Sequence, residues 1–195
     1  GLRMKLFKKV LAAALAGVLA LSVLTGCGSG SGTVDYTPQV VKALNNLYAE
    51  EGITVTEGDA AMKTKLKQFM SKVLDSDVSF DGVTDIIEAI TEDEKLAAEI
   101  KKMFPTAVLD DSTKPLYNIG MVQIEQSIND SNIKRYAQEM VDDNSVELNY
   151  PDVVGGDDFD EGLEWTAVVT TVTINNQEYL VGLLSRQVYT LAVEE

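Results

Sequence analysis

The stretch Glu164–Leu184, EWTAVVTTVTINNQEYLVGLL, decides the fold of this chain. Its first part, Glu164–Ile174, is rich in Val and Thr and alternates in polarity, which is typical of a β-strand with two different faces. Asn175-Asn176 tolerate positive φ and suit a two-residue hairpin turn. We therefore expect Tyr179–Leu184 to pair back antiparallel, and Val188–Val193 to add a third strand.

Outward from this hairpin, residues 37–142 read mainly as helix. Thr37-Pro38 supplies an N-cap followed by proline at the first helical position, and Gly52 is a natural C-terminal stop. A second helix is predicted over Ala60–Leu74, because apolar residues recur there at helical spacing opposite a set of lysines.

Two further helices are predicted. Thr91-Glu-Asp-Glu94 matches a capping box and opens a helix that ends before Pro105. Ser131 is predicted to cap a fourth helix that extends to Val141. Residues 106–120 read as a long connection, and Gly120–Ile128 fits either a strand or a helix.

This order of elements predicts an α+β fold. Helices come before strands, so we expect the N-terminal helices to pack on one face of a C-terminal antiparallel sheet of about three or more strands. The order is loosely similar to that of cone-shaped NTF2-like domains, and the similarity concerns the element order alone.

The N-terminus has the organisation of an export signal. Lys5, Lys8 and Lys9 precede an apolar run of 15 residues, Val10–Leu24. A helix that spans a bilayer needs about 20 apolar residues, so this run suits a signal peptide better than a membrane span.

The end of that run is more specific, because Leu24-Thr25-Gly26-Cys27 resembles the lipobox of bacterial lipoprotein precursors. The resemblance implies that residues 1–26 are cleaved and that Cys27 begins the mature chain with a diacylglycerol on its thiol. Residues 27–34 then form the lipidated cysteine and a Gly/Ser tether, and residues 35–195 form a single domain. The implied location is the extracytoplasmic face of the cell membrane, or the outer membrane of a Gram-negative cell.

Composition excludes several classes of protein. The chain has 195 residues, no His and one Cys, so Ser-His-Asp catalysis, His-ligated zinc and intrachain disulfides are excluded. The net charge is -15, and removal of residues 1–26 takes away four basic residues and no acid, which leaves 12 basic and 31 acidic residues and a net charge of -19. This charge argues against nucleic acid as a partner, and an anionic lipid surface repels the domain as a whole.

A calcium site is one candidate for chemistry. Residues 77–88, DVSFDGVTDIIE, resemble the calcium loop of EF-hand proteins. The resemblance implies oxygen ligands from six positions: Asp77, Ser79, Asp81, Val83 through its carbonyl, Asp85, and Glu88. Phe80 within the loop, Thr84 and the lack of a second loop depart from the family. The alternative is that Asp77 and Asp81 are turn residues before a short helix.

Other polar patterns are less specific. The acidic stretch Asp152–Glu164 reads as a solvated loop or a loose cation site. Paired carboxylates would permit glycoside hydrolysis, but 31 acidic residues make such pairs easy to propose anywhere. Trp165, Tyr179 and Tyr189 on the predicted strands either fill the core or form a binding face.

From these observations we expect a membrane-anchored lipoprotein with a non-catalytic binding or scaffolding role at the cell envelope. It needs no cofactor in this interpretation, and its envelope ligand is unknown. The alternatives are a calcium-binding module that uses residues 77–88 and a carboxylate-based envelope hydrolase.

Overall fold

The computed structural model describes residues 34–76, 82–107, 115–150 and 159–190. Five strands form one sheet in the order β1-β4-β5-β2-β3. They are β1 (Thr54–Glu57), β2 (Leu116–Gln123), β3 (Ser145–Glu147), β4 (Phe159–Ile174) and β5 (Gln177–Thr190). Strand β1 runs parallel to β4, and the other pairs are antiparallel. The sheet is therefore mixed.

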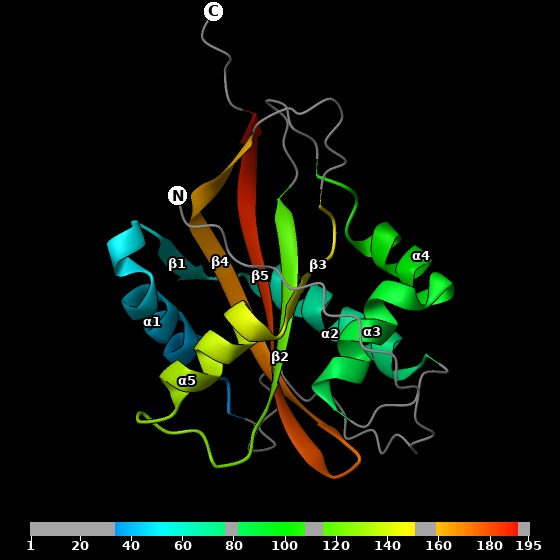
Figure 1. Cartoon of the computed structure of the whole chain (residues 1–195), viewed down its shortest axis with the longest axis horizontal. Coiled ribbons are helices and arrows are strands. Elements are labelled where there is room, and N and C mark those ends of the chain that lie inside the picture. Colours follow the sequence, from blue (N-terminus) through cyan, green and yellow to red (C-terminus); the bar gives the residue numbers. More distant parts are fainter. Residues whose placement is uncertain (1–33, 77–81, 108–114, 151–158, 191–195) are drawn as a thin grey trace, which may run out of the picture.

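Helices lie on both sides of this sheet (Figure 1). They are α1 (Thr37–Leu47), α2 (Ala60–Leu74), α3 (Val83–Glu92), α4 (Glu94–Met103) and α5 (Ile133–Gln138), with a short 3-10 turn η1 (Ala49–Glu51) and a π-helical turn η2 (Glu139–Asp143). Helices α1 and α5 lie on one side, and α2, α3 and α4 lie on the other.

The hairpin of β4 and β5 forms as the sequence predicts. Asn175 and Asn176 adopt φ of 51° and 64°, the left-handed conformation that a two-residue turn of this type requires. The strands are longer than predicted, because β4 starts at Phe159 and β5 continues without a break to Thr190. The separate third strand predicted over Val188–Val193 is therefore wrong: residues 188–190 continue β5, and residues 191–193 lie outside the described residues.

Alternation along the strands gives the sheet two different apolar faces. We call the face against α1 and α5 the α1 face, and the face against α2, α3 and α4 the α2 face. Val169, Leu180 and Leu184 point to the α1 face, while Val168 and Leu183 point to the α2 face. Because side chains alternate with a period of two, the central strands β4 and β5 are buried on both sides, whereas only Val55 of the edge strand β1 is buried.

Helix α1 also satisfies backbone groups along the β1–β4 edge. Asn45 accepts a hydrogen bond from the Val55 N–H (2.7 Å) and donates to the Val55 carbonyl (2.8 Å). The buried Thr37 hydroxyl accepts from the Val169 N–H (3.1 Å), where β4 extends beyond the end of β1. Unpaired backbone N–H and C=O groups on an edge strand can pair with strands of other molecules. The hydrogen bonds from α1 occupy these groups at Val55 and Val169.

Several predicted boundaries differ from the structure. Asp93, not Thr91, caps α4 by accepting from the Leu96 N–H (2.8 Å), while Thr91 donates back to the Glu88 carbonyl (2.9 Å) inside α3. Asn132, not Ser131, occupies the N-cap of α5.

Residues predicted as connection or as ambiguous form strand β2, and the short strands β1 and β3 were not predicted at all. Helix α2 has both predicted ends.

The predicted α+β class is confirmed. The predicted antiparallel sheet is corrected by the parallel β1–β4 pair, and the single helical face is corrected by the two separate core clusters. Because β1 lies between α1 and α2, and β2 precedes α5, helices do not precede all strands. The element order that suggested an NTF2-like domain is therefore absent from the described part of the chain.

Candidate functional site

A buried ion pair occupies the α1 face near one end of the sheet. Arg186 lies on the central strand β5, and its side chain is only 2% exposed. Its guanidinium lies 3.1 Å from the Glu161 carboxylate and 5.8 Å from the ring centroid of Trp165. Removing a charge from water is costly unless it is paired, so a buried arginine at this position calls for an explanation.

A β-bulge brings Glu161 to Arg186. Trp165 pairs with Arg186, but Glu161 pairs with Val188, so β4 uses four residue steps where β5 uses two. A regular ladder would place Leu163 opposite Val188, but in the structure Leu163 is half exposed. The indole N–H of Trp165 donates to the Gly162 carbonyl (3.1 Å) within the bulge. Bulges commonly re-aim a side chain in this way, and they are over-represented beside active sites.

Asn118 lies diagonally next to this pair. It is the cross-strand neighbour of Leu184 on β5 and of Glu147 on β3, and it shares the α1 face with Arg186. Asn118 is 1% exposed, and neither its amide nitrogen nor its amide oxygen has a hydrogen-bond partner among the described residues. A buried amide without partners costs free energy, typically about 1–3 kcal/mol.

Burial and two nearby carboxylates act in opposite directions on the charge of Arg186. Burial lowers the pKa of Arg186 below its ordinary value, and the charge and hydrogen bond of Glu161, together with Glu147 and Tyr150, oppose that shift. Arginine stays protonated in proteins, so Arg186 remains a cation flanked by two acidic side chains. The polar cluster of Arg186, Glu161, Glu147 and Asn118 is therefore net acidic, with a free amide donor and acceptor beside it.

Aromatic residues support the polar cluster from the side of α1. The ring centroids of Tyr48 and Trp165 are 5.4 Å apart, and the Tyr48 hydroxyl donates to the Asp142 carboxylate (2.7 Å). Burial and the Asp142 carboxylate raise the pKa of Tyr48 well above its usual range. This hydrogen bond joins the end of α1 to the π-helical turn η2, so two elements hold Trp165 against Arg186.

The π-helical turn η2 approaches the sheet closely at two glycines, where any larger residue would collide with it. A Cβ atom at Gly120 would collide with the backbone carbonyl of Met140, and one at Gly182 would lie 2.6 Å from the Met140 methyl group. Two adjacent glycines on the α1 face therefore make room for η2.

The six residues of the predicted calcium loop are only partly described. Asp77, Ser79 and Asp81 lie outside the described residues. Val83 is the first residue of α3, so its carbonyl accepts a helical hydrogen bond, and Asp85 is buried in the first turn of the same helix. Glu88 lies on α3, one turn before Glu92. Partial desolvation of Glu92 raises its pKa, and the hydrogen bond and the charge of Glu88 raise it further. In the described ranges no three His, Cys, Asp or Glu side chains gather as a metal site.

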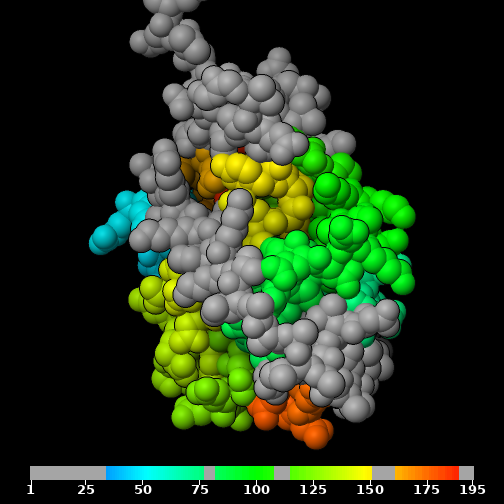
Figure 2. All heavy atoms as spheres, turned by 45° about the vertical axis from the view of Figure 1, so that its right-hand side comes forward, coloured from blue at the N-terminus to red at the C-terminus, as the bar shows by residue number. Residues whose placement is uncertain are grey.

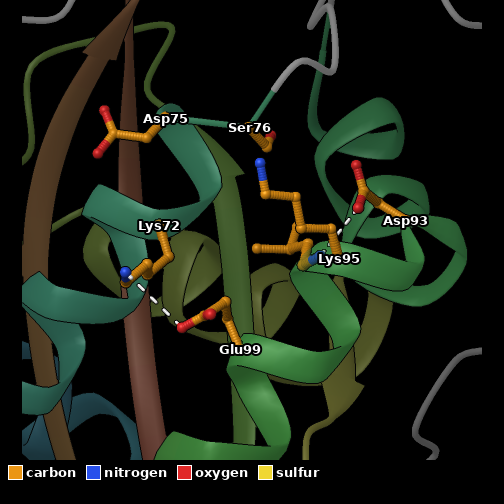
Figure 3. Close-up of a pocket in the computed structure, with 7 residues that line it drawn as sticks. Lys72, Asp75, Ser76, Asp93, Lys95 and Glu99 are labelled. Atoms are coloured by element: carbon orange, nitrogen blue, oxygen red, sulfur yellow. Dashed lines mark hydrogen bonds and ion pairs between the residues drawn. The ribbon is translucent and has the colours of Figure 1, made fainter.

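A hollow lies on the other side of the sheet, between the end of α2 and the start of α4 (Figure 3). It encloses about 390 Å³. Lys72 points toward Glu99 (3.7 Å), and Lys95 extends toward Ser76. Asp93 lines the hollow while it caps α4. The mixture of lysines and carboxylates favours no single charge of ligand.

Sequence reasoning missed the polar cluster. Glu161 was predicted to lie in a solvated loop and instead forms a buried pair on β4. The available signal was Arg186, a lone arginine inside the apolar run Tyr179–Val193, because buried charges in strands require partners. Nothing local indicates which acid pairs with it.

No helix among the described residues has the length and apolar character needed to cross a membrane. Comparison of the chain with models of protein families, with curated proteins and with solved structures gave no match.

Proposed function

We propose that the protein is a membrane-anchored lipoprotein with a non-catalytic binding role at the cell envelope, and that its ligand contacts the polar cluster around Asn118. The anchoring rests on the lipobox-like residues Leu24–Cys27. The binding role rests on the buried Asn118 amide without hydrogen-bond partners. Buried polar groups are nearly always satisfied in native proteins, so this amide is most simply explained by a ligand that completes it.

The chemistry of the polar cluster defines the kind of ligand. Asn118 offers one amide donor group and one acceptor, which match a neutral group with both functions, such as an amide or a hydroxyl. Glu161 and Glu147 outnumber Arg186, so an additional anion is disfavoured and a neutral or cationic ligand is favoured.

A hydrolase is less well supported. Catalysis by two carboxylates needs both groups in a cleft, one with a raised pKa. Glu92 has a raised pKa beside Glu88, but this pair lies one turn apart on α3, where Glu92 is exposed at the surface.

A ligand screen followed by a paired substitution tests the binding role. Trp165 is the only tryptophan and lies against Arg186, so its fluorescence reports on the polar cluster. Small amides, amino sugars and short peptides would be titrated into the soluble domain. We expect a fluorescence change that is lost in Asn118→Leu and retained in Asn46→Leu, an exposed asparagine on α1.

Two outcomes would count against these proposals. Asn118→Leu is expected to fold at least as stably as the wild type, because it replaces a buried amide without partners by an apolar group. A ligand that binds this variant unchanged would contradict the assigned site. For the anchor, failure of Cys27→Ser to move the protein from the membrane fraction to the soluble fraction would contradict lipidation.

A further inference from the structure

Basic residues are unevenly distributed over this acidic domain. Seven of the 12 basic residues that follow residue 26 lie on α2 and α4: Lys63, Lys65, Lys67, Lys72, Lys95, Lys101 and Lys102. Residues 59–75 and 93–104 carry these seven lysines and five acids, a net charge of +2. The other residues after 26 carry five basic and 26 acidic residues, a net charge of -21. We call the seven lysines the lysine surface.

One carboxylate connects the parts of the lysine surface that lie on α2 and on α4. The Glu99 carboxylate lies 3.7 Å from the Lys72 Nζ atom and 3.3 Å from the Lys102 Nζ atom, so it joins α2 to α4. The side chains of Lys72 and Lys102 are 51% and 73% exposed. Figure 2 shows residues of α3 and α4 at the surface on this side of the molecule. Helix α2 contains no acidic residue from Ala60 to Leu74.

The lysine surface also lies next to the point where the proposed tether enters the domain. Lys63 on α2 contacts the Asp35 carboxylate (3.1 Å). Partial burial raises the pKa of Asp35, but hydrogen bonds from Thr37 and Lys63 lower it more, so the pKa lies below its ordinary value and the pair stays charged. Eight residue steps separate Asp35 from Cys27, which at about 3.6 Å per residue span at most about 29 Å.

We propose that the lysine surface of α2 and α4 is the side of the domain that faces the anionic headgroups of the bilayer to which the protein is anchored. This inference rests on the proposed lipid anchor. A domain with a net charge of -19 is repelled by an anionic surface, so among the orientations that a short tether permits, the least acidic side faces the lipid. The α1 face, which contains the polar cluster, is then directed away from the bilayer.

The test uses the full lipidated chain in vesicles. One cysteine for a fluorescent label is placed on α2 as Gln68→Cys, and a second version carries it on α1 as Asn46→Cys. Cys27 does not react with the label when its sulfur carries the diacylglycerol as a thioether. Vesicles contain phosphatidylcholine alone or with phosphatidylglycerol, and a headgroup-attached quencher reports proximity to the lipid surface.

With phosphatidylglycerol present, we expect stronger quenching at residue 68 than at residue 46. Each lysine near an anionic surface favours its orientation about fivefold, so Lys67→Glu/Lys102→Glu is expected to abolish the difference. Lys42→Glu/Lys134→Glu makes the same change in charge on α1 and α5 and is expected to preserve it. Molar salt, where the Debye length is about 3 Å, is expected to reduce it.

The possible failures are distinguishable. A wild-type chain that does not float with vesicles would overturn the proposed anchor and this inference together. A chain that floats but shows equal quenching at the two positions, or equal effects of the two charge-reversed variants, would overturn the inference alone. A difference that persists in pure phosphatidylcholine would also overturn it, because the anionic headgroups would then have no part in it.

Discussion

The α1 face and the α2 face of the sheet are covered by different chemistry. On the α2 face, three helices bury Phe69, Phe104 and a set of aliphatic residues. On the α1 face, two helices cover a core that also contains the buried Arg186–Glu161 pair and Asn118. Burial of apolar side chains dominates the α2 face, although α3 also buries Asp85 there. The Asn118 amide has no hydrogen-bond partner among the described residues, so it contributes no internal hydrogen bond to the fold, and for this reason we assign the binding role to the α1 face.

The largest expected effect concerns the buried ion pair. Glu161→Leu leaves the Arg186 charge in the core with less compensation, and we expect a loss of about 3–5 kcal/mol in the free energy of unfolding. Glu161→Leu/Arg186→Leu removes both charges and is expected to be close to the wild type in stability, or above it. Urea denaturation of both variants measures this. A double variant as unstable as the single one would show that the pair itself holds the α1 face together.

A smaller effect should separate the two glycines beneath η2. In Gly120→Ala the new methyl group meets the Met140 backbone, so we expect a loss of about 3 kcal/mol. In Gly182→Ala it meets the flexible end of the Met140 side chain, and we expect about 1 kcal/mol. Thermal melts of the two variants make the comparison. Equal losses would mean that η2 moves as easily as a side chain.

The edge of the sheet under α1 provides the next test. Asn45→Ala removes the partners of the Val55 N–H and carbonyl, and we expect a loss of about 2 kcal/mol together with a greater tendency to aggregate. Asn46→Ala changes the exposed neighbour and is expected to stay within about 0.5 kcal/mol of the wild type. Denaturation and light scattering report the two effects. Similar behaviour of the two variants would show that the edge needs no such cover.

The calcium hypothesis places a metal site in residues 77–88, which lead into α3 on the α2 face of the sheet. If residues 77–88 bind calcium, calcium at ten times its Kd stabilises the domain by about 1.4 kcal/mol relative to EDTA. The calcium hypothesis predicts this gain in the wild type and its loss in Glu88→Gln, measured as a difference in Tm. An unchanged Tm at millimolar calcium would contradict a calcium site in residues 77–88.

The smallest effect is a pH dependence on the α1 face. The pKa of Tyr48 is raised in the folded protein, so above pH 10, the ordinary value, the unfolded chain loses this proton first. The protonated Tyr48 hydroxyl makes its full contribution to the free energy of unfolding below pH 10. This contribution falls as the pH rises, and about 0.8 kcal/mol of it is lost at pH 10.5. Tyr48→Phe is expected to flatten this decline in alkaline denaturation, while Tyr117, whose pKa is also raised, sustains part of it. An unchanged slope would assign the decline to other groups.

Elements with local signals were predicted well from the sequence. Helix α2 has a cap at Asp59 and an apolar stripe within one segment, and both of its ends were predicted. The turn at Asn175-Asn176 likewise depends on two adjacent residues. Where two local signals compete the prediction fails: Thr91 and Asp93 are both good caps, and only packing of α3 against α4 decides between them.

Features that depend on distant partners were not predictable. Strand β1 has four residues, and its partner β4 lies about 110 residues further along the chain. The pairing of Glu161 with Arg186 depends on a β-bulge in β4 that no local sequence pattern predicts. Asn118 shows the same limit, because its burial follows from neighbours on β3 and β5 that are remote in sequence.

The strand order has a consequence for how the chain matures. The two long strands near the centre of the sheet, β4 and β5, are synthesised last, and β1 and β2 must wait for them. During synthesis from the N-terminus, α1 and α2 therefore remain without the surfaces that they cover until β4 and β5 emerge. The hairpin then closes within microseconds, because its turn needs only Asn175-Asn176. Strand β5 is the only described link between the β1–β4 pair and the β2–β3 pair, so a chain cut short at residue 176 is expected to form no continuous sheet.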